Sequence, residues 1–178
     1  MGKIVVLIVD VQCALVEGHP FNEAMIIKNI NRLLGAARQN KIEIIYVRHD
    51  GGLGDELERD TKGWEIYHAI APMPNERIFD KKFNSAFRET GLQEYLDRKG
   101  TKTIILAGMQ TEYCIDTTCK VAFEFGYNIV IPEDTTTTFD NNSLTGKTLA
   151  KYYEQKIWRE RFAKVLTVDD TINEYISR

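Results

Sequence analysis

An unbroken run of apolar residues from Ile4 to Val9 constrains the fold more than any other part of the sequence. The run is rich in β-branched residues, which favour a strand, and no polar residue alternates within it. Such a strand is buried on both faces, as in a parallel sheet that helices cover on each side. Asp10 ends the run and places a carboxylate at the edge of that sheet.

The rest of the chain alternates between strand and helix patterns. From Asn22, a residue suited to cap a helix, apolar residues recur at helical spacing as far as Asn40. Predicted strands occupy 4–9, 42–47, 78–79, 103–107, 127–131 and 165–168, and predicted helices occupy 22–40, 90–99, 114–126 and 144–162, with a short helix at the C-terminus. We therefore expect one α/β domain over residues 1–178, a Rossmann-like three-layer α/β/α sandwich around a mostly parallel six-stranded sheet.

Composition narrows the class of ligand and the compartment. The 178 residues carry a formal net charge of −3 and no basic segment of the kind that binds nucleic acid, so we expect a small-molecule substrate as partner. The three cysteines, Cys13, Cys114 and Cys119, form no CxxC pair, which argues against a disulfide framework and favours a cytoplasmic location. No apolar stretch has the length of a membrane span or a signal peptide, so we expect no membrane partner.

Three reactive side chains follow predicted strands: Asp10, Lys81 and Cys114. The carboxyl ends of parallel strands meet at one edge of the sheet, where ligands bind in open α/β folds, so we expect these side chains to converge. Cys114 lies where a polar turn leads into a helix, and the dipole and free N–H groups of a helix N-terminus favour thiolate over thiol. A thiol beside a carboxylate and an ammonium indicates nucleophilic catalysis. By contrast, we expect Cys13 and Cys119 to be small buried hydrophobic residues.

The segments around these residues resemble the isochorismatase-like cysteine hydrolases, the superfamily that includes nicotinamidases and related amidases. The resemblance covers nearly the whole chain and depends on residues 6–12, 81–87 and 107–114, the last followed by Thr117 and Ala122. It implies an isochorismatase-like fold.

The resemblance also implies a site. Its catalytic triad is Asp10, Lys81 and Cys114, with Lys81 preferred to Lys82 because of its spacing to Ser85. It further implies a cis peptide bond between Met109 and Gln110, and an oxyanion hole formed by the backbone N–H groups of Gln110 and Cys114. The implied reaction is hydrolysis of the C–N bond of a small amide through a thioester, without a cofactor.

Two alternatives to a metal-independent amide hydrolase stay open. Metal-dependent nicotinamidases carry an Asp and two His residues in the loop after the second strand, where this chain has His49 and Asp50, while His68 lies 19 residues after His49. Metal sites need three or four convergent ligands, so we expect no metal and treat nicotinamidase as the second candidate. The other alternative is a non-catalytic binding protein that retains the fold; rapid, selective alkylation of Cys114 near neutral pH would favour the enzyme over this alternative.

A long loop without periodicity, residues 49–75, is predicted beside the site. Leu15, Trp64 and Tyr113 are candidates for the pocket wall, since they lie after Asp10, in the long loop and beside Cys114. Gln12 is expected to orient backbone near Asp10.

Two further expectations concern the second half of the chain. The threonine run 135–138 is predicted to form a loop. The helix around residues 151–158 carries Tyr152, Tyr153 and Trp158, and an exposed aromatic stripe there would suit a homo-oligomer interface.

Overall fold

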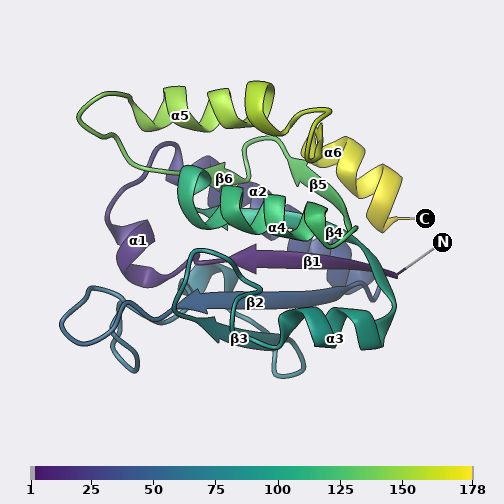
Figure 1. Ribbon diagram of the computed structural model, residues 1–178, viewed down its shortest axis with the longest axis horizontal. Helices are drawn as coiled ribbons and strands as arrows, with labels where there is room; N and C mark the ends of the chain where they lie inside the picture. The colour runs from purple at the N-terminus through teal and green to yellow at the C-terminus, as the bar shows by residue number, and fades with distance from the viewer. Residues whose placement is uncertain (1–2, 178) are drawn as a thin grey trace.

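The computed structural model describes residues 3–177 and contains one sheet with helices on both faces (Figure 1). Every strand pairing in it is parallel. In chain order the strands are β1 (Lys3–Val9), β2 (Glu43–His49), β3 (Arg77–Lys81), β4 (Thr101–Met109), β5 (Asn128–Pro132), β6 (Thr136–Thr137) and β7 (Lys164–Leu166). The three-layer α/β/α prediction is therefore confirmed, with one strand more than the six expected.

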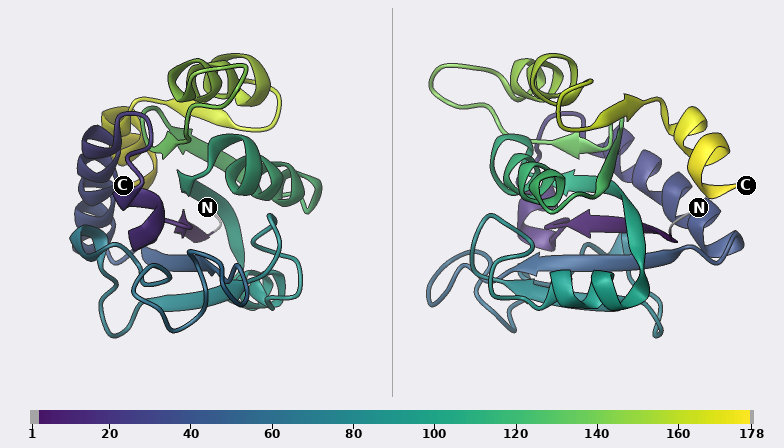
Figure 2. Two further views of the ribbon diagram at one scale, coloured as in Figure 1. Left: turned by 90° about the vertical axis from the view of Figure 1, so that its left-hand side faces the viewer. Right: turned by 45° about the vertical axis from the view of Figure 1, so that its right-hand side comes forward.

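The helices divide between the two faces of the sheet (Figure 2). In chain order the α-helices are α1 (Cys13–Glu17), α2 (Glu23–Gln39), α3 (Leu92–Lys99), α4 (Asp116–Glu124), α5 (Gly146–Tyr152) and α6 (Val168–Thr171). The other helical segments are η1 (His68–Ile70), η2 (Thr111–Ile115), η3 (Tyr153–Trp158) and η4 (Ile172–Ile176). The helices α2, α6 and η4 pack on one face, and α3, α4 and η3 pack on the other. No helix in residues 3–177 is both long enough and apolar enough to cross a bilayer.

The core explains why β1 is apolar from Ile4 to Val9. Val5, Leu7 and Val9 belong to the cluster under α3 and α4, while Val6 and Ile8 belong to the cluster under α2. Side chains alternate between the faces of a strand, so a strand covered on both sides has no solvent-facing position.

The strand order places the carboxyl ends of β1 and β4 at the centre of the sheet. The order is β3-β2-β1-β4-β5-β7, with β6 beside the end of β4. The chain builds outward from β1 through β2 to β3, and then from β4 in the opposite direction. Crevices at such reversals are the usual ligand sites of open α/β sheets.

Gly108 allows β1 and β4 to approach closely at this point. Its φ is 132°, and a Cβ atom added to it would lie 1.9 Å from the carbonyl oxygen of Val9. A side chain at this position would separate the ends of the two strands that deliver Asp10 and Cys114.

The threonine run differs from the loop that the sequence predicted. Thr136 and Thr137 are buried and form β6, which pairs with Gly108 and Met109 of β4. The Thr137 hydroxyl donates to the backbone carbonyl of Phe21. Threonine suits a strand because its branched Cβ fits a pleated sheet.

The helix expected over residues 144–162 is shorter and less exposed. It consists of α5 and η3 and ends at Trp158, which is fully buried, while Tyr153 packs against the core and Tyr152 is 53% exposed. The structure therefore contains no aromatic stripe on this helix. The homo-oligomer stays a prediction, which sedimentation at micromolar concentration would check.

Candidate active site

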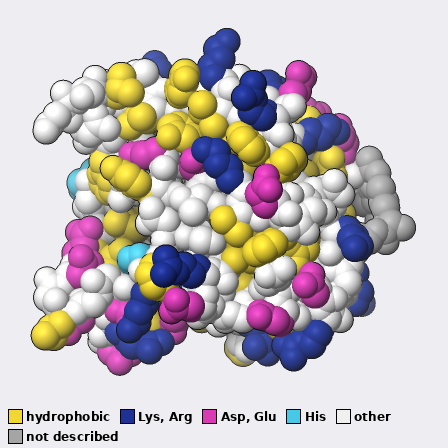
Figure 3. Space-filling view, viewed as in Figure 1, with side chains coloured by type: hydrophobic (Ala, Val, Ile, Leu, Met, Phe, Trp, Pro, Cys, Tyr) yellow, Lys and Arg dark blue, Asp and Glu magenta, His cyan; other side chains and the backbone are white. Residues whose placement is uncertain are grey.

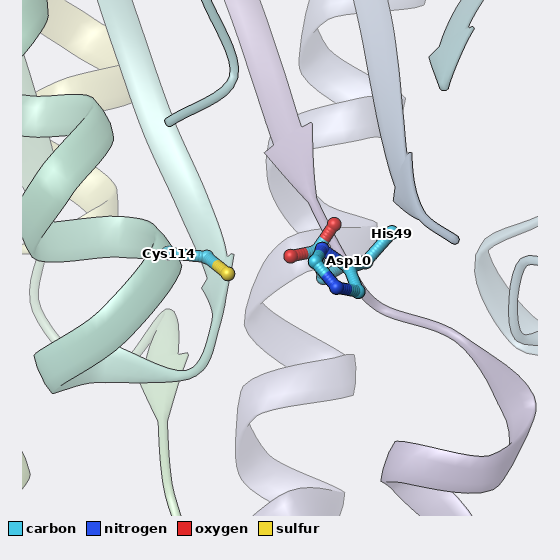
Figure 4. A group of neighbouring side chains, drawn as sticks. All are labelled: Asp10, His49 and Cys114. Atoms are coloured by element: carbon cyan, nitrogen blue, oxygen red, sulfur yellow. The ribbon is translucent and has the colours of Figure 1, made fainter. Parts of the chain in front are cut away.

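The three residues predicted to converge lie within contact distance at the carboxyl edge of the sheet. Asp10 follows β1, Lys81 ends β3, and Cys114 lies in η2 after β4. The Lys81 Nζ atom is 2.6 Å from Asp10 Oδ2 and 3.1 Å from Cys114 Sγ. Figure 4 shows the Cys114 sulfur pointing toward the Asp10 carboxylate. All three residues are buried.

The Lys81 ammonium has a third partner, His49, at the end of β2. Lys81 Nζ lies 3.0 Å from His49 Nδ1, and the two residues are register partners between β2 and β3. An ammonium carries three N–H donors and no acceptor, so Asp10, Cys114 and His49 together satisfy a side chain that has no solvent exposure. In this arrangement His49 Nδ1 accepts, which leaves the proton of the neutral ring on Nε2.

Burial dominates the electrostatics of the site. Loss of solvent raises the pKa of the Asp10 carboxyl, and the Lys81 charge opposes that rise. Burial, together with the negative charge of Asp10, raises the pKa of the Cys114 thiol to about 12. Burial and the Lys81 charge lower the pKa of His49. The thiol and the imidazole are therefore neutral at rest, beside the Asp10–Lys81 contact.

The raised thiol pKa differs from the expectation of a resting thiolate, so rapid alkylation of Cys114 near neutral pH no longer distinguishes an enzyme from a binding protein. Cys114 does not occupy the first turn of an α-helix but the fourth position of η2, ahead of α4. Desolvation and the adjacent carboxylate outweigh the stabilisation that a helix N-terminus offers. A base is therefore needed to remove the proton before the sulfur can attack.

We expect alkylation of Cys114 by iodoacetamide to be slow at pH 7 and to accelerate by about tenfold per pH unit up to pH 9, because the thiolate fraction rises tenfold per unit well below the pKa. Mass spectrometry of labelled peptides would follow Cys13 and Cys119 in the same sample as internal controls. A labelling rate that stayed constant above pH 7 would instead mean that the thiolate is already formed at rest.

The Gln12 side chain fixes the backbone around the site. Its Nε2 atom donates to the carbonyl oxygens of His49 at 3.0 Å and Trp64 at 2.9 Å, and its Oε1 atom accepts from the His49 N–H at 2.8 Å. Gln12 is fully buried and out of reach of water, so its polar atoms are satisfied by these backbone groups. One side chain thus joins the loop after β1 to the end of β2 and to the long loop.

Replacing Gln12 with leucine is expected to lower the free energy of unfolding by roughly 1–3 kcal/mol, because backbone groups of His49 and Trp64 lose their partners while still buried. Urea denaturation would measure the change. The matched control is Gln39→Leu at an exposed position on α2. Equal stability of the two variants would contradict a bridging role for Gln12.

A cavity of about 260 Å³ opens over these side chains. Its lining residues are Asp10, Leu15, His49, Gly51, Asp55, Glu56, Leu57, Asn84, Gln110, Tyr113 and Cys114. Two of the three candidates for the pocket wall, Leu15 and Tyr113, line it.

Trp64 is not one of the lining residues, so that prediction is wrong. Its ring is buried and lies beneath the guanidinium of Arg48, 3.5 Å from the ring centroid. The long loop folds back so that Trp64 supports the loop from inside, while other loop residues form the cavity wall.

The Met109–Gln110 peptide bond is cis in this structure. Gln110 lines the cavity beside Cys114, and its side-chain oxygen lies 3.4 Å from the Thr138 hydroxyl. The turn that follows β4 thereby brings both Gln110 and Cys114 to the cavity.

The donor atoms of Asp10, His49 and Cys114 lie within 4.8 Å of one another, a spacing that a metal ion would accept. This group does not fit a metal, because the Lys81 ammonium already lies within bonding distance of one atom from each residue. His68 lies in η1, is exposed and is not in the group, so the second histidine of a nicotinamidase-type site is absent from it.

Sequence reasoning missed several residues of the cavity. Asn84 Oδ1 accepts a long, 3.9 Å contact from the Cys114 thiol, and its place three positions after Lys81 offered a signal. Asp55 and Glu56 lie in the long loop, where periodicity gave no means of predicting which side chains face the site.

Comparison with known proteins agrees with the fold. The profile of the isochorismatase domain matches residues 4–170. A streptothricin hydrolase of Streptomyces noursei is 32% identical over 75% of this chain, which spans about half (49%) of that relative's length. The uncharacterized isochorismatase family protein YrdC of Bacillus subtilis is 28% identical over 98% of this chain and 97% of its own. The structure of a cysteine hydrolase from Pseudomonas syringae matches with a TM-score of 0.86 at 25% identity, covering 98% of this chain and 93% of that one. The chain belongs to the isochorismatase family of hydrolases.

Proposed function

We propose that this protein hydrolyses the C–N bond of a small amide, with Cys114 as the nucleophile and no metal ion. The observation that carries the proposal is the position of the Lys81 ammonium, which contacts both the Asp10 carboxylate and the Cys114 sulfur in one cavity. The name of the cysteine hydrolase from Pseudomonas syringae supports the same class of chemistry for this chain.

The first half of the reaction forms a thioester. Asp10 Oδ1, which has no hydrogen-bond partner among the described residues, takes the proton of the Cys114 thiol as the sulfur attacks the amide carbon. An S–C bond forms, and the carbonyl oxygen becomes an oxyanion held by the backbone N–H groups of Gln110 and Cys114. When the oxyanion collapses the C–N bond breaks, and ammonia or an amine leaves with the proton from Asp10.

The second half consumes water. Asp10, again a carboxylate, removes a proton from a water molecule as its oxygen attacks the thioester carbon. The C–S bond then breaks, the leaving sulfur takes the proton back from Asp10, and the carboxylic acid is released from the regenerated thiol enzyme. Throughout, the Lys81 charge stabilises the negative charge that develops on the sulfur. Its raised pKa makes Asp10 a stronger base than an ordinary carboxylate.

The non-catalytic alternative fits these residues less well. Burying a carboxylate and an ammonium costs several kcal/mol per ion, and apolar residues of similar volume would often stabilise a fold as much or more. An ion pair placed in a cavity against a thiol is therefore better explained by chemistry than by folding.

The test is release of ammonia from a panel of small amides, including nicotinamide, before and after treatment with a metal chelator. We expect release that the chelator leaves unchanged, and formation of a hydroxamate when hydroxylamine replaces water as the acceptor of the thioester. Nicotinamide as the best substrate would select the nicotinamidase alternative. Absence of ammonia and hydroxamate with every amide would overturn the proposal.

A further inference from the structure

The charged residues that line the cavity are all acidic. Asp55 and Glu56 lie on the wall, and Asp10, the partner of Lys81, lies on the floor; no Lys or Arg is part of the lining. Figure 3 shows Asp and Glu side chains at the left margin of the molecule, the side toward which β1 and β2 point in Figure 1, with Lys and Arg side chains beside them at the lower left. Within the cavity itself a substrate meets only carboxylates as charged lining groups.

Nearby cations do not neutralise Asp55 and Glu56. The Lys81 ammonium already pairs with Asp10 and is satisfied by three acceptors. The basic residues nearest along the chain have other partners: Arg48 and Arg59 pair with Asp80, and Lys62 lies 3.9 Å from Glu17. Within residues 3–177 neither Asp55 nor Glu56 forms an ion pair.

The floor of the cavity adds a second, independent observation. Asp10 is 1% exposed, lines the cavity, and its Oδ1 atom makes no hydrogen bond with any described residue. A buried carboxylate oxygen without a donor disfavours anions in the cavity and favours groups that donate hydrogen bonds.

We infer that the substrate is a small amide that carries a cationic group, such as an ammonium or a guanidinium, which Asp55 and Glu56 recognise while the amide carbon faces Cys114. The inference rests on the proposed function and names the substrate class for the same site. The cavity volume of about 260 Å³ limits the substrate to a few heavy atoms beyond the amide.

Three amides of matched size test the charge preference: 4-aminobutanamide is cationic, pentanamide is neutral and succinamate is anionic. We expect kcat/KM for ammonia release to fall by about tenfold from the cationic to the neutral amide, and further for the anion. Added salt is expected to weaken hydrolysis of the cation and to leave the neutral amide nearly unchanged.

Variants of Asp55 and Glu56 test whether these two carboxylates cause the preference for the cationic amide. Asp55→Asn keeps the acceptor that binds the Leu57 N–H at 2.8 Å, and Glu56→Gln changes an exposed side chain, so both variants are expected to fold. Each variant should reduce, by several-fold, the ratio of kcat/KM for the cationic amide to kcat/KM for the neutral amide. Asp60→Asn, in the same loop but outside the cavity lining, is the charge-matched control and should leave the ratio unchanged.

Binding to the Cys114→Ala variant separates this inference from the proposed function. Calorimetry should detect tighter binding of 4-aminobutanamide than of pentanamide even if no amide is hydrolysed, in which case only the hydrolytic proposal fails. Equal or weaker binding of the cation, or a ratio unaffected by Asp55→Asn and Glu56→Gln, would overturn the charge inference, whether or not ammonia is released.

Discussion

Replacing Cys114 with alanine is expected to lower kcat/KM for amide hydrolysis by about 10⁴-fold or more, because no other group in the cavity can form the covalent intermediate. Asp10 and Lys81 remain in the variant, so hydrolysis would depend on direct attack by water. We expect the fold to persist, since Cys114 lines the cavity and its removal opens no sealed void. Ammonia release under single-turnover conditions measures the loss.

Cysteines outside the site provide the controls for this variant. Cys119 is buried in the core under α4, and Cys13 lies in α1; alanine at either position is expected to affect stability more than the chemical step. Hydroxamate formation in the presence of hydroxylamine should disappear only with Cys114→Ala. Wild-type hydrolysis by that variant would rule out the cysteine mechanism and leave Asp10 as the candidate for activating water directly.

The sequence predicted the site residues that follow strands better than those that come from loops. Asp10 follows an apolar run and Cys114 follows a glycine turn, so strand ends alone placed both at one edge of the sheet. Lys81 could be predicted as a site residue only from the family resemblance, because a lysine at the end of a short, half-exposed strand usually faces solvent. The fold class followed from the alternation of strands and helices, which depends on local patterns.

The errors arose where long-range contacts decide the outcome. Thr136 and Thr137 form a strand only because β4 extends beyond β5 and offers them a partner. Trp64 turns inward because Gln12 and Arg48, remote in sequence, hold it. His49 was considered as a metal ligand, yet its register partner Lys81 gives it the role of hydrogen-bond acceptor. None of these pairings has a local signature in the sequence.

Lys81→Met is expected to abolish hydrolysis and to lower the free energy of unfolding by about 3–5 kcal/mol near pH 8, because it leaves the buried Asp10 carboxylate without its partner. Methionine retains most of the stem of lysine. The decrease in the free energy of unfolding therefore results mainly from loss of the Lys81 charge, and less from the change in side-chain volume. Urea denaturation of the wild type and the variant would measure it.

The pH dependence of this loss separates charge from packing. In the wild type burial raises the pKa of Asp10 and Lys81 opposes the rise, so without Lys81 the folded-state pKa is higher still. A carboxyl whose pKa is higher in the folded than in the unfolded state destabilises the fold progressively as it ionises. The deficit of Lys81→Met should therefore be smallest below about pH 4, where Asp10 is protonated in both states, and should grow as the pH rises.

The double variant Asp10→Asn with Lys81→Met completes the test, because it removes both charges of the pair. It should recover most of the stability lost in Lys81→Met, with little dependence on pH, while remaining inactive because both the base and the cation are missing. The same deficit at pH 4 and pH 8, or a double variant less stable than Lys81→Met, would mean that Lys81 stabilises the fold through packing of its stem. A double variant that is as stable as the wild type or more stable, but inactive, would instead show that the fold does not need the Asp10–Lys81 pair. The pair would then serve catalysis, and any excess stability of the double variant would measure what the pair costs the fold.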